Sequence, residues 1–316
     1  YHETLTPRSG EAESPITYKA YEGEEVIISG ANEVTGFEHH EGDIYKAPVQ
    51  LTQGDKNQVF VNGDMGFNAR WPNTATGKFY EGFAEVESGS NTTITDPKLA
   101  EFGDDFFKGA TVWVNAGSRW TSQTSEVTDH SGDTITLNGL GLTDVQNTPA
   151  KGNPYYLFNV YGALDSENEW WYDEEEQMLY LYGDPTGKTV QVKARDTAIN
   201  LDNVSYVNID GIQVLGAGIS GTNTSSITLN RVEANYAAHA STIENPYGTD
   251  VASIKLFGNN NTISNCEVAY SSATGVWISG DDNLLFNSKI HDTDYIGSYG
   301  ACINVSGSGN VVSHNT

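Results

Sequence analysis

The chain has 316 residues, of which 37% are apolar, 11% aromatic and 18% charged, a composition that excludes intrinsic disorder. Its 42 acidic and 16 basic residues give a net charge of −26, which repels phosphate backbones and argues against nucleic-acid binding. No run of 18 apolar residues occurs, so we expect no membrane-spanning helix, and abundant glycine favours strands joined by tight turns.

Residues 50–190 are predicted to form a compact antiparallel β barrel or sandwich. Turn signals such as Ser131-Gly132-Asp133 and Asn138-Gly139 separate short strand candidates at 58–61, 110–114, 134–137, 155–159 and 178–182. Residues 98–107 are a candidate short helix. Arg70 is expected to anchor a loop. The tryptophans of this segment are expected in the core or at a domain interface, with sugar stacking as the alternative for one of them: Trp113, Trp120, Trp170 and Trp171.

An internal repeat dominates the last third of the chain. Segments 254–261, 276–283 and 303–310 share the pattern apolar-x-apolar-x-Gly-x-x-Asn, and a further short strand follows each one. Repeats of this length indicate a solenoid or array, and alternation within each strand places one set of apolar side chains inside. The glycine is expected to supply a positive φ at a corner, and the asparagine to stack inside the bend.

On this repeat, residues 199–316 resemble the right-handed parallel β-helix proteins of the pectate-lyase-like superfamily. Residues 1–5 and 14–30 resemble the first rungs of such proteins. Segments 60–63, 69–73, 169–173 and 179–182 resemble an inserted β domain found in several carbohydrate-active β-helix families, including some glycoside hydrolases. The superfamily contains hydrolases, lyases and non-catalytic proteins, so the resemblance is specific for architecture rather than activity.

The resemblance implies an all-β fold: a right-handed parallel β-helix solenoid with an inserted antiparallel β barrel or sandwich domain. The expected division is N-terminal rungs at 1–49, the inserted domain at 50–190, and the parallel β-helix at 191–316. The two cysteines, Cys266 and Cys302, occupy different phases of the repeat, so we expect two buried thiols rather than a disulfide.

The repeat also predicts a substrate groove. Lys255, Trp277 and Asn304 share one phase on successive rungs and should form an outward stack about 4.8 Å apart per rung. Loops 237–252, 270–275 and 292–300 should project from one edge beside this stack. Together they describe a groove for an extended sugar chain, with its rim supplied by His239, Asp250, His291, Asp292, Asp294, Tyr295 and Tyr299.

Each groove residue also has a structural alternative. Trp277 would then pack on the inserted domain, Lys255 would be a solvated surface lysine, and His291-Asp292 would form a hydrogen bond that only shapes a turn.

Two reactions compete for this groove. A glycoside hydrolase needs two carboxylates, for which Asp250, Asp292 and Asp294 are the main candidates, with His291 beside them and Glu244 as a further loop carboxylate. A polysaccharide lyase needs a base, here Lys255, His239, His291 or Tyr295, and a cation or metal that neutralises a uronate. The net charge of −26 repels a polyuronate, so hydrolysis is favoured.

A non-catalytic function stays open beside both. The last rung stops just after a strand begins, so rungs at the two ends could stack head to tail into adhesive filaments. The expected partner is a polysaccharide, and the expected location is secreted or at the cell surface, weakly favoured by five Asn-x-Ser/Thr sites. No cofactor or metal is expected, although Asp281-Asp282 leave a Ca²⁺ site open without supporting ligand spacing.

Overall fold

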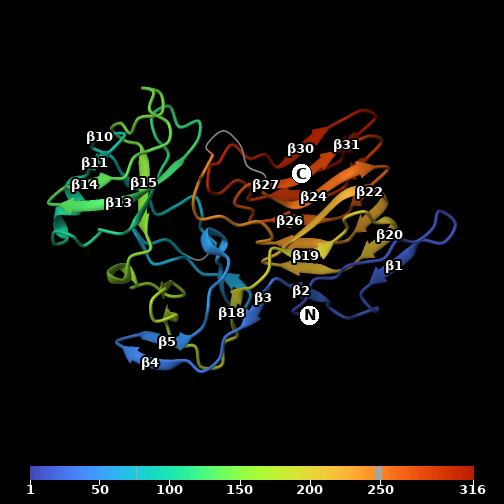
Figure 1. Ribbon diagram of the computed structural model, residues 1–316, viewed down its shortest axis with the longest axis horizontal. Coiled ribbons are helices and arrows are strands. Elements are labelled where there is room, and N and C mark those ends of the chain that lie inside the picture. The colour runs from blue at the N-terminus through green and yellow to red at the C-terminus, as the bar shows by residue number, and fades with distance from the viewer. Residues whose placement is uncertain (76, 246–250) are drawn as a thin grey trace.

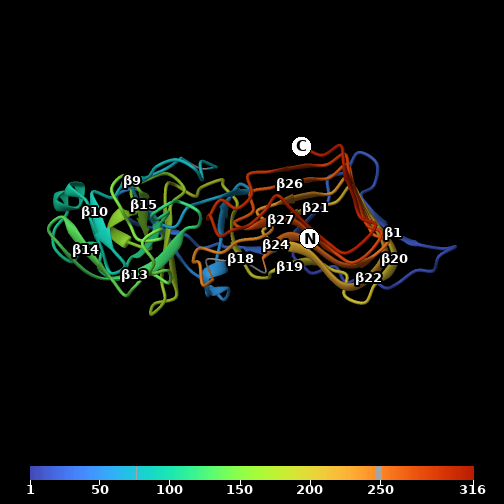
Figure 2. The ribbon, with the colours of Figure 1, turned by 90° about the horizontal axis from the view of Figure 1, so that it is seen from above.

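A computed structural model describes residues 1–75, 77–245 and 251–316 of the chain. The chain is all-β, with a curled parallel sheet and several antiparallel sheets. Figure 1 shows the parallel strands gathered on one side of the molecule and the largest antiparallel sheet on the other, with the β4–β5 hairpin below them. Figure 2 shows these two parts side by side along the long axis, with β18 between them. Within the described ranges no helix is long and apolar enough to cross a membrane.

The parallel part repeats a unit of three strands. In the last units, β24, β27 and β30 pair in parallel, as do β25, β28 and β31, and as do β26 and β29. Their bounds are β24 Ala252–Asn259, β25 Thr262–Ser264, β26 Glu267–Ala269, β27 Thr274–Ser279, β28 Leu284–Phe286, β29 Lys289–His291, β30 Ile303–Ser306 and β31 Val311–Ser313. We call this part the parallel stack.

Earlier strands extend the same stack. The long strand β22 pairs with β19, β20, β24 and β25, while β21 and β23 continue the row of β26. Two N-terminal strands join it, because β1 pairs in parallel with β20 and β2 with β21. The bounds are β1 Ile16–Lys19, β2 Ile27–Ser29, β19 Thr197–Asn200, β20 Ser205–Asp210, β21 Gln213–Leu215, β22 Gly218–Asn230 and β23 Glu233–Asn235.

The largest antiparallel sheet has the order β10-β11-β14-β13-β12-β15-β8, with β9 also paired to β15. Its core combines aromatic and aliphatic side chains, among them the fully buried Phe107 and Tyr155. The bounds are β8 Arg70–Trp71, β9 Ala84–Glu85, β10 Ser88–Ser90, β11 Thr93–Thr95, β12 Thr111–Val114, β13 Gln123–Ser131, β14 Thr134–Leu137 and β15 Pro154–Phe158. In place of the short helix expected at 98–107 stands a 3₁₀ turn, η2 (Pro97–Glu101), whose N-cap Asp96 accepts a hydrogen bond from the Lys98 amide.

Two four-stranded sheets connect these parts. One has the order β16-β17-β5-β4 and the other β3-β18-β6-β7. Two short 3₁₀ turns accompany them, η1 (Gly54–Lys56) and η3 (Tyr161–Ala163). The bounds are β3 Ala31–Glu33, β4 Glu38–Glu41, β5 Ile44–Pro48, β6 Val59–Val61, β7 Asp64–Met65, β16 Trp170–Asp173, β17 Met178–Tyr182 and β18 Val190–Lys193.

The interior of the parallel stack follows the alternation of the repeat. Ile254, Leu256, Val276 and Ile278 are buried in one continuous core, and the inward side chains of β30 pack against it. Asparagines line the bend beside this core, as the repeat predicts. The backbone amide of Asn261 donates to Oδ1 of Asn283 at 2.9 Å, and the amide of Asn283 donates to Oδ1 of Asn310 at 2.9 Å.

Two details of the stack differ from expectation. Gly280 and Gly307 have the predicted positive φ, at +121° and +110°, but Gly258 lies inside β24 without one. Glycine is required there for another reason, because a Cβ would collide with the carbonyl oxygen of Thr224. The prediction of two buried thiols is wrong for one of them: Cys266 is buried, whereas Cys302 is exposed beyond the core.

Candidate functional site

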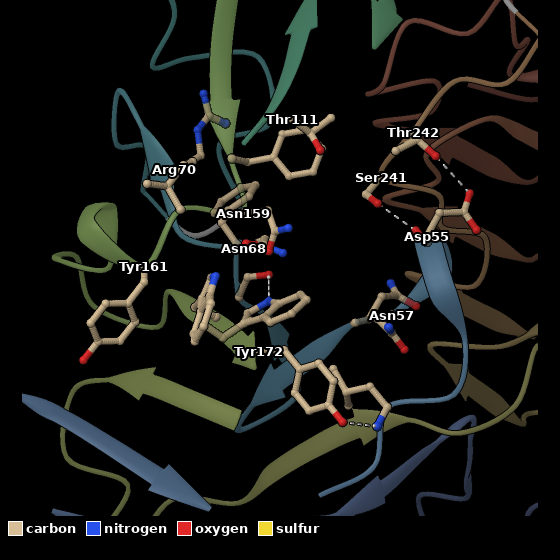
Figure 3. Close-up of a pocket in the computed structure, with 18 of the residues that line it drawn as sticks. Asp55, Asn57, Asn68, Arg70, Thr111, Asn159, Tyr161, Tyr172, Ser241 and Thr242 are labelled. Carbon is tan, nitrogen blue, oxygen red and sulfur yellow. Dashed lines mark hydrogen bonds between the residues drawn. The ribbon is translucent and has the colours of Figure 1, made fainter. Parts of the chain in front are cut away.

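A pocket of about 820 Å³ lies where the parallel stack, the largest antiparallel sheet and the β16–β17 hairpin meet. Each part contributes residues to the lining, and the segment before β6 places Asp55 beside Ser241 and Thr242 on one side (Figure 3). Its volume is typical of a site for a small or oligomeric ligand. Among the residues that line the pocket are Asp55, Gln58, Asn68, Arg70, Tyr156, Trp170, Trp171, Tyr172, His239, Ser241, Thr242 and Tyr295.

Asp55 stands on the wall formed by the stack. Its backbone carbonyl accepts hydrogen bonds from the amide and the hydroxyl of Ser241, at 2.8 and 2.9 Å, and the Thr242 hydroxyl donates to its carboxylate at 3.4 Å. Burial raises the pKa of the Asp55 carboxyl, the charge of Lys56 opposes this, and the charge of Glu244 raises it further. Asp55 is therefore a carboxyl group that holds its proton more readily than an ordinary surface aspartate.

The opposite wall is built around Arg70, which is buried in β8. Its guanidinium donates to the carbonyl oxygens of Pro72 and Gly82 and lies 3.9 Å from the ring centre of Tyr156. These contacts bear out the expected role of Arg70 as a loop anchor. The Arg70 amide donates to Glu169 Oε1 at 3.4 Å; Glu169 is 2% exposed, and burial raises the pKa of its carboxyl to about 8.

Aromatic side chains cover much of the remaining surface. Trp170 is buried, while Trp171 and Tyr172 are half-buried and line the pocket with it. The Tyr172 hydroxyl accepts a hydrogen bond from the Leu51 amide at 3.3 Å, which fixes its ring at the rim. Of the other two tryptophans, Trp113 is buried and donates to the Ile296 carbonyl at 2.7 Å, as expected for an interface. Trp120 is 66% exposed, contrary to the expectation of a buried position.

Two of the predicted rim residues reach this pocket. His239 Nδ1 and Tyr295 Oη lie 2.5 Å apart and share a hydrogen bond, and Tyr295 also stacks on Phe79 at 4.3 Å between ring centres. Burial lowers the pKa of His239 to about 3, helped by the charge of Lys193, so the imidazole is neutral near pH 7. Burial raises the pKa of Tyr295 well above its usual value.

The two leading acid candidates lie close to the pocket but do not line it. Asp294 accepts hydrogen bonds from the amide and hydroxyl of Ser298, at 2.8 and 3.0 Å, and burial raises the pKa of its carboxyl. Asp292 lies 2.6 Å from His291 Nδ1, and His291 Nε2 lies 2.9 Å from Glu267. Burial raises the pKa of the nearby Tyr80 to about 12, and the negative charges of Asp292 and Asp294 contribute to this shift.

Lys255, Trp277 and Asn304 lie side by side on the outer face of the stack, in the register that their spacing predicts. The ammonium group of Lys255 lies 5.0 Å from the Trp277 ring centre and 4.9 Å from that of Phe257. These three residues do not line the pocket. The Lys255 ammonium group lies over the Trp277 ring in a cation–π contact. Tyr299 is 66% exposed, and Asp250 lies outside the described residues.

Most of the pocket was not foreseen from the sequence. Asp55, Gln58, Asn68, Tyr156 and Tyr172 fall in segments without a repeat, so no shared phase indicated that they meet. For Trp170 and Trp171 the sequence did offer an indication, because sugar stacking was the alternative role predicted for one of the tryptophans in this segment.

Metal ligands do not gather in the described part of the chain, where no group of three or more His, Cys, Asp or Glu side chains could hold an ion. The two aspartates considered for Ca²⁺ follow β27 at a turn, where Asp281 Oδ1 accepts a hydrogen bond from the Ser308 amide at 2.8 Å.

No protein-family model matches the chain, and no curated protein matches it in sequence. A solved structure described as "Glycoside hydrolase" matches with a TM-score of 0.60 and 14% identity, over 99% of this chain and 87% of that one. A second, described as "The complex structure of XylC with xylose", matches with a TM-score of 0.52 and 12% identity over the whole of this chain. The present chain spans about half of that second chain, 51% of its length.

A third match is much weaker. The tailspike protein gp49 from Pseudomonas phage LKA1 aligns with 74% of this chain at 10% identity, but its TM-score of 0.16 supports no argument. At these identities the first two matches show a shared all-β fold and nothing finer.

Proposed function

We propose that the protein binds a polysaccharide in the pocket between the parallel stack and the antiparallel sheet, and that it hydrolyses a glycosidic bond there. In this proposal the stack winds as a right-handed parallel β-helix, residues 50–190 form an inserted domain, and the substrate is met outside the cell or at its surface. The fold shared with a structure named as a glycoside hydrolase supports a carbohydrate-active role.

The observation that carries the proposal is the combination of an aromatic wall with a proton-holding carboxyl in one cavity. Sugar rings present apolar C–H faces that pack on rings such as those of Trp170, Trp171 and Tyr172. Glycoside hydrolysis needs one carboxyl group that donates a proton to the leaving oxygen, and burial raises the pKa of the Asp55 carboxyl, which favours that role.

A second carboxylate stands near the first. Glu244 lies close enough that its charge raises the pKa of the Asp55 carboxyl. We assign Asp55 as the general acid and Glu244, which is exposed, as the second carboxylate of the reaction. Asp250, Asp292, Asp294 and His291 remain the competing assignment. Asp292 and Asp294 are less suitable, because they form hydrogen bonds with His291 and Ser298 that stabilise the conformation of their own loop.

Hydrolysis is favoured over elimination by the chemistry of the cavity. A lyase needs a base that loses its proton readily, whereas burial raises the pKa of both Tyr156 and Tyr295. It also needs a cation that binds the uronate carboxylate, and the Arg70 guanidinium is already engaged by two carbonyl oxygens. End-to-end filaments stay an untested prediction.

The test is a polysaccharide panel with two readouts, released reducing ends and the ultraviolet absorbance of unsaturated products. Hydrolysis gives reducing ends alone, and elimination gives both. We expect Asp55→Asn to lower kcat by about 10²- to 10⁴-fold. The alkaline limb of the pH profile should vanish with it, because the general acid must be protonated and activity falls as pH rises through its pKa.

Matched variants decide between the two assignments. Glu244→Gln should lose activity like Asp55→Asn, whereas Asp292→Asn and Asp294→Asn should keep most of it. Asp184→Asn, at an exposed turn outside the pocket, is the control. Full activity in Asp55→Asn together with loss in Asp292→Asn or Asp294→Asn would move the reaction to the 292–300 loop.

A further inference from the structure

A buried lysine lies close to Asp55 but outside the pocket lining. Lys193 is the last residue of β18, its side chain is 1% exposed, and its ammonium group lies 3.1 Å from Asp196 Oδ1. An ammonium group removed from water needs a carboxylate beside it. Burial lowers the pKa of Lys193, and the charge of Asp196 opposes this. Asp196 is therefore the group that supports the charge of this lysine.

Asp196 pairs with a second lysine through its other oxygen. The ammonium group of Lys56, the last residue of η1, lies 3.0 Å from Asp196 Oδ2. The backbone of Asp196 is itself fixed, because its carbonyl oxygen accepts a hydrogen bond at 2.9 Å from the amide of Gly218, the first residue of β22. One carboxylate fixed to the parallel stack thus binds cations from both η1 and β18.

This arrangement decides where the Lys56 cation lies. Lys56 follows Asp55 directly in η1, and its charge opposes the rise in the pKa of Asp55 that burial causes. In the described part of the chain Lys56 forms its ion pair with Asp196, and no ion pair joins it to Asp55. A cation paired directly with the Asp55 carboxylate would stabilise the charged form more strongly, and the carboxyl would lose its proton at a lower pH.

The other groups near Asp55 do not replace Lys56 in this role. The charge of Glu244 raises the pKa of Asp55, and the hydrogen bond from the Thr242 hydroxyl lowers it. His239 is neutral near pH 7. The pocket lining also contains charged groups from the antiparallel sheets and their loops: Arg70, Lys108, Asp173, Glu174 and Glu175. Lys56 is the cation next to the proposed acid, so its position matters most.

We propose that Asp196 is a positioning residue for the general acid: by pairing with Lys56 and Lys193 at once, it keeps the Lys56 ammonium group from pairing with the Asp55 carboxyl group, which then retains the proton it donates. This inference rests on the proposed function, in which Asp55 is the acid. It deepens that function by naming a residue outside the pocket lining that controls the acid.

The experiment is a titration of Asp55 itself, which needs no substrate. Carbon-13 NMR of the chain labelled at its aspartate carboxyl carbons follows each carboxyl, and the signal missing in Asp55→Asn identifies the one of interest. We expect Asp196→Asn to lower the pKa of Asp55 by at least about 1, because the released Lys56 then pairs with it. Asp196→Glu should restore most of the original value. An unchanged pKa in Asp196→Asn would overturn the inference.

A double-variant cycle separates the position of Lys56 from the charge of Asp196. Lys56→Met removes the cation and should raise the pKa of Asp55. Adding Asp196→Asn to Lys56→Met should then leave this pKa nearly unchanged, because no lysine remains to be released. A drop as large as in the wild-type background would come from the lost charge of Asp196 alone, and would refute the positioning role.

The matched control is Glu87→Gln. It also removes a carboxylate that pairs with a lysine, Lys151 at 2.6 Å, but between β9 and β10 and outside the pocket lining. It should leave the pKa of Asp55 unchanged.

Folding is checked by circular dichroism, because Asp196→Asn leaves Lys193 buried without its carboxylate. If that variant does not fold, Lys193→Met/Asp196→Asn removes the buried pair together and still releases Lys56. The same lowering of the pKa of Asp55 is expected there, and its absence would again overturn the inference.

The outcome is distinguishable from that of the proposed function. With an active substrate, Asp196→Asn should move the alkaline limb of the pH profile to lower pH, because activity falls as pH rises through the pKa of the acid. If Asp55→Asn keeps full activity, the proposed function loses its acid and this inference fails with it. If Asp55→Asn is inactive but the pKa of Asp55 does not respond to Asp196→Asn, only this inference fails.

Discussion

The parallel stack and the largest antiparallel sheet bury their polar groups in different ways. In the stack, Asn261, Asn283 and Asn310 occupy equivalent places and pass hydrogen bonds from one unit to the next. In the antiparallel sheet the buried polar pairs occur at unrelated places, such as the Tyr155 hydroxyl on the Asp96 carboxylate at 2.9 Å and the Gln123 amide on the Asn147 carbonyl oxygen at 2.9 Å. Hydrogen bonds that recur in each unit therefore link the stability of neighbouring units, whereas an isolated pair stabilises only the residues around it.

The largest effect should come from breaking the asparagine row. Asn283→Ala removes the acceptor of the buried Asn261 amide and the side-chain donor to the partly buried Gly258 carbonyl. We expect a loss of about 3 kcal/mol in the free energy of unfolding, measured by urea denaturation with circular dichroism. Asn304→Ala, an exposed asparagine of the same stack, should change it by less than about 0.5 kcal/mol. Equal losses in the two variants would contradict the coupling.

A second effect concerns the pH dependence of stability rather than its value at one pH, and it should arise at the buried Glu169, which accepts a hydrogen bond from the Arg70 amide. Its pKa is raised from 4.5 to about 8, so the folded state holds a proton that the unfolded state releases. Stability is then fully present below about pH 4.5 and is lost as pH rises towards 8, by up to about 1.4 kcal/mol per pH unit. Glu169→Gln should flatten this slope in thermal melts recorded from pH 5 to 8. An unchanged slope in the variant would assign it to other groups.

The smallest effect should follow from the isolated pair. Tyr155→Phe removes the hydroxyl from Asp96, which keeps its hydrogen bond from the Lys98 amide at 3.0 Å. We expect a loss of about 1.5 kcal/mol in the free energy of unfolding. Tyr161→Phe, whose exposed hydroxyl donates to Glu41, is the control and should be nearly neutral. A loss as large as that of Asn283→Ala would show that isolated and repeated pairs matter equally.

The same contrast explains how far the sequence could be interpreted. The first two strands of the later units were predicted at nearly the right positions, because a repeat states their register several times. The third row was not predicted, and the segment that forms β29 was interpreted as a turn. In the antiparallel sheets the segment at 134–137 matches β14, and the segment at 178–182 matches β17 of the smaller sheet β16-β17-β5-β4. There each strand is signalled once, so its existence could be predicted but not its partner.

The pocket lay beyond this kind of reasoning. Asp55 meets Ser241 and Thr242 across almost 190 residues, and the contact depends on how a loop of the stack folds over η1. No periodicity connects these positions. His239 and Tyr295 were predicted for the rim because they precede strands of the repeat, and these two are the predicted site residues that line the pocket.

The pairing of the first strands has a consequence for how the chain is made. Strand β1 has its partner in β20, and Ile16 pairs with Val207, a separation of 191 residues. At a translation rate of about 5 to 20 residues per second, the ribosome needs roughly 10 to 40 s to deliver that partner. During this interval the antiparallel sheet, whose strands lie between Arg70 and Phe158, can fold first. The opening strands must wait unpaired, which makes them the segment most exposed to chaperones and to aggregation during synthesis.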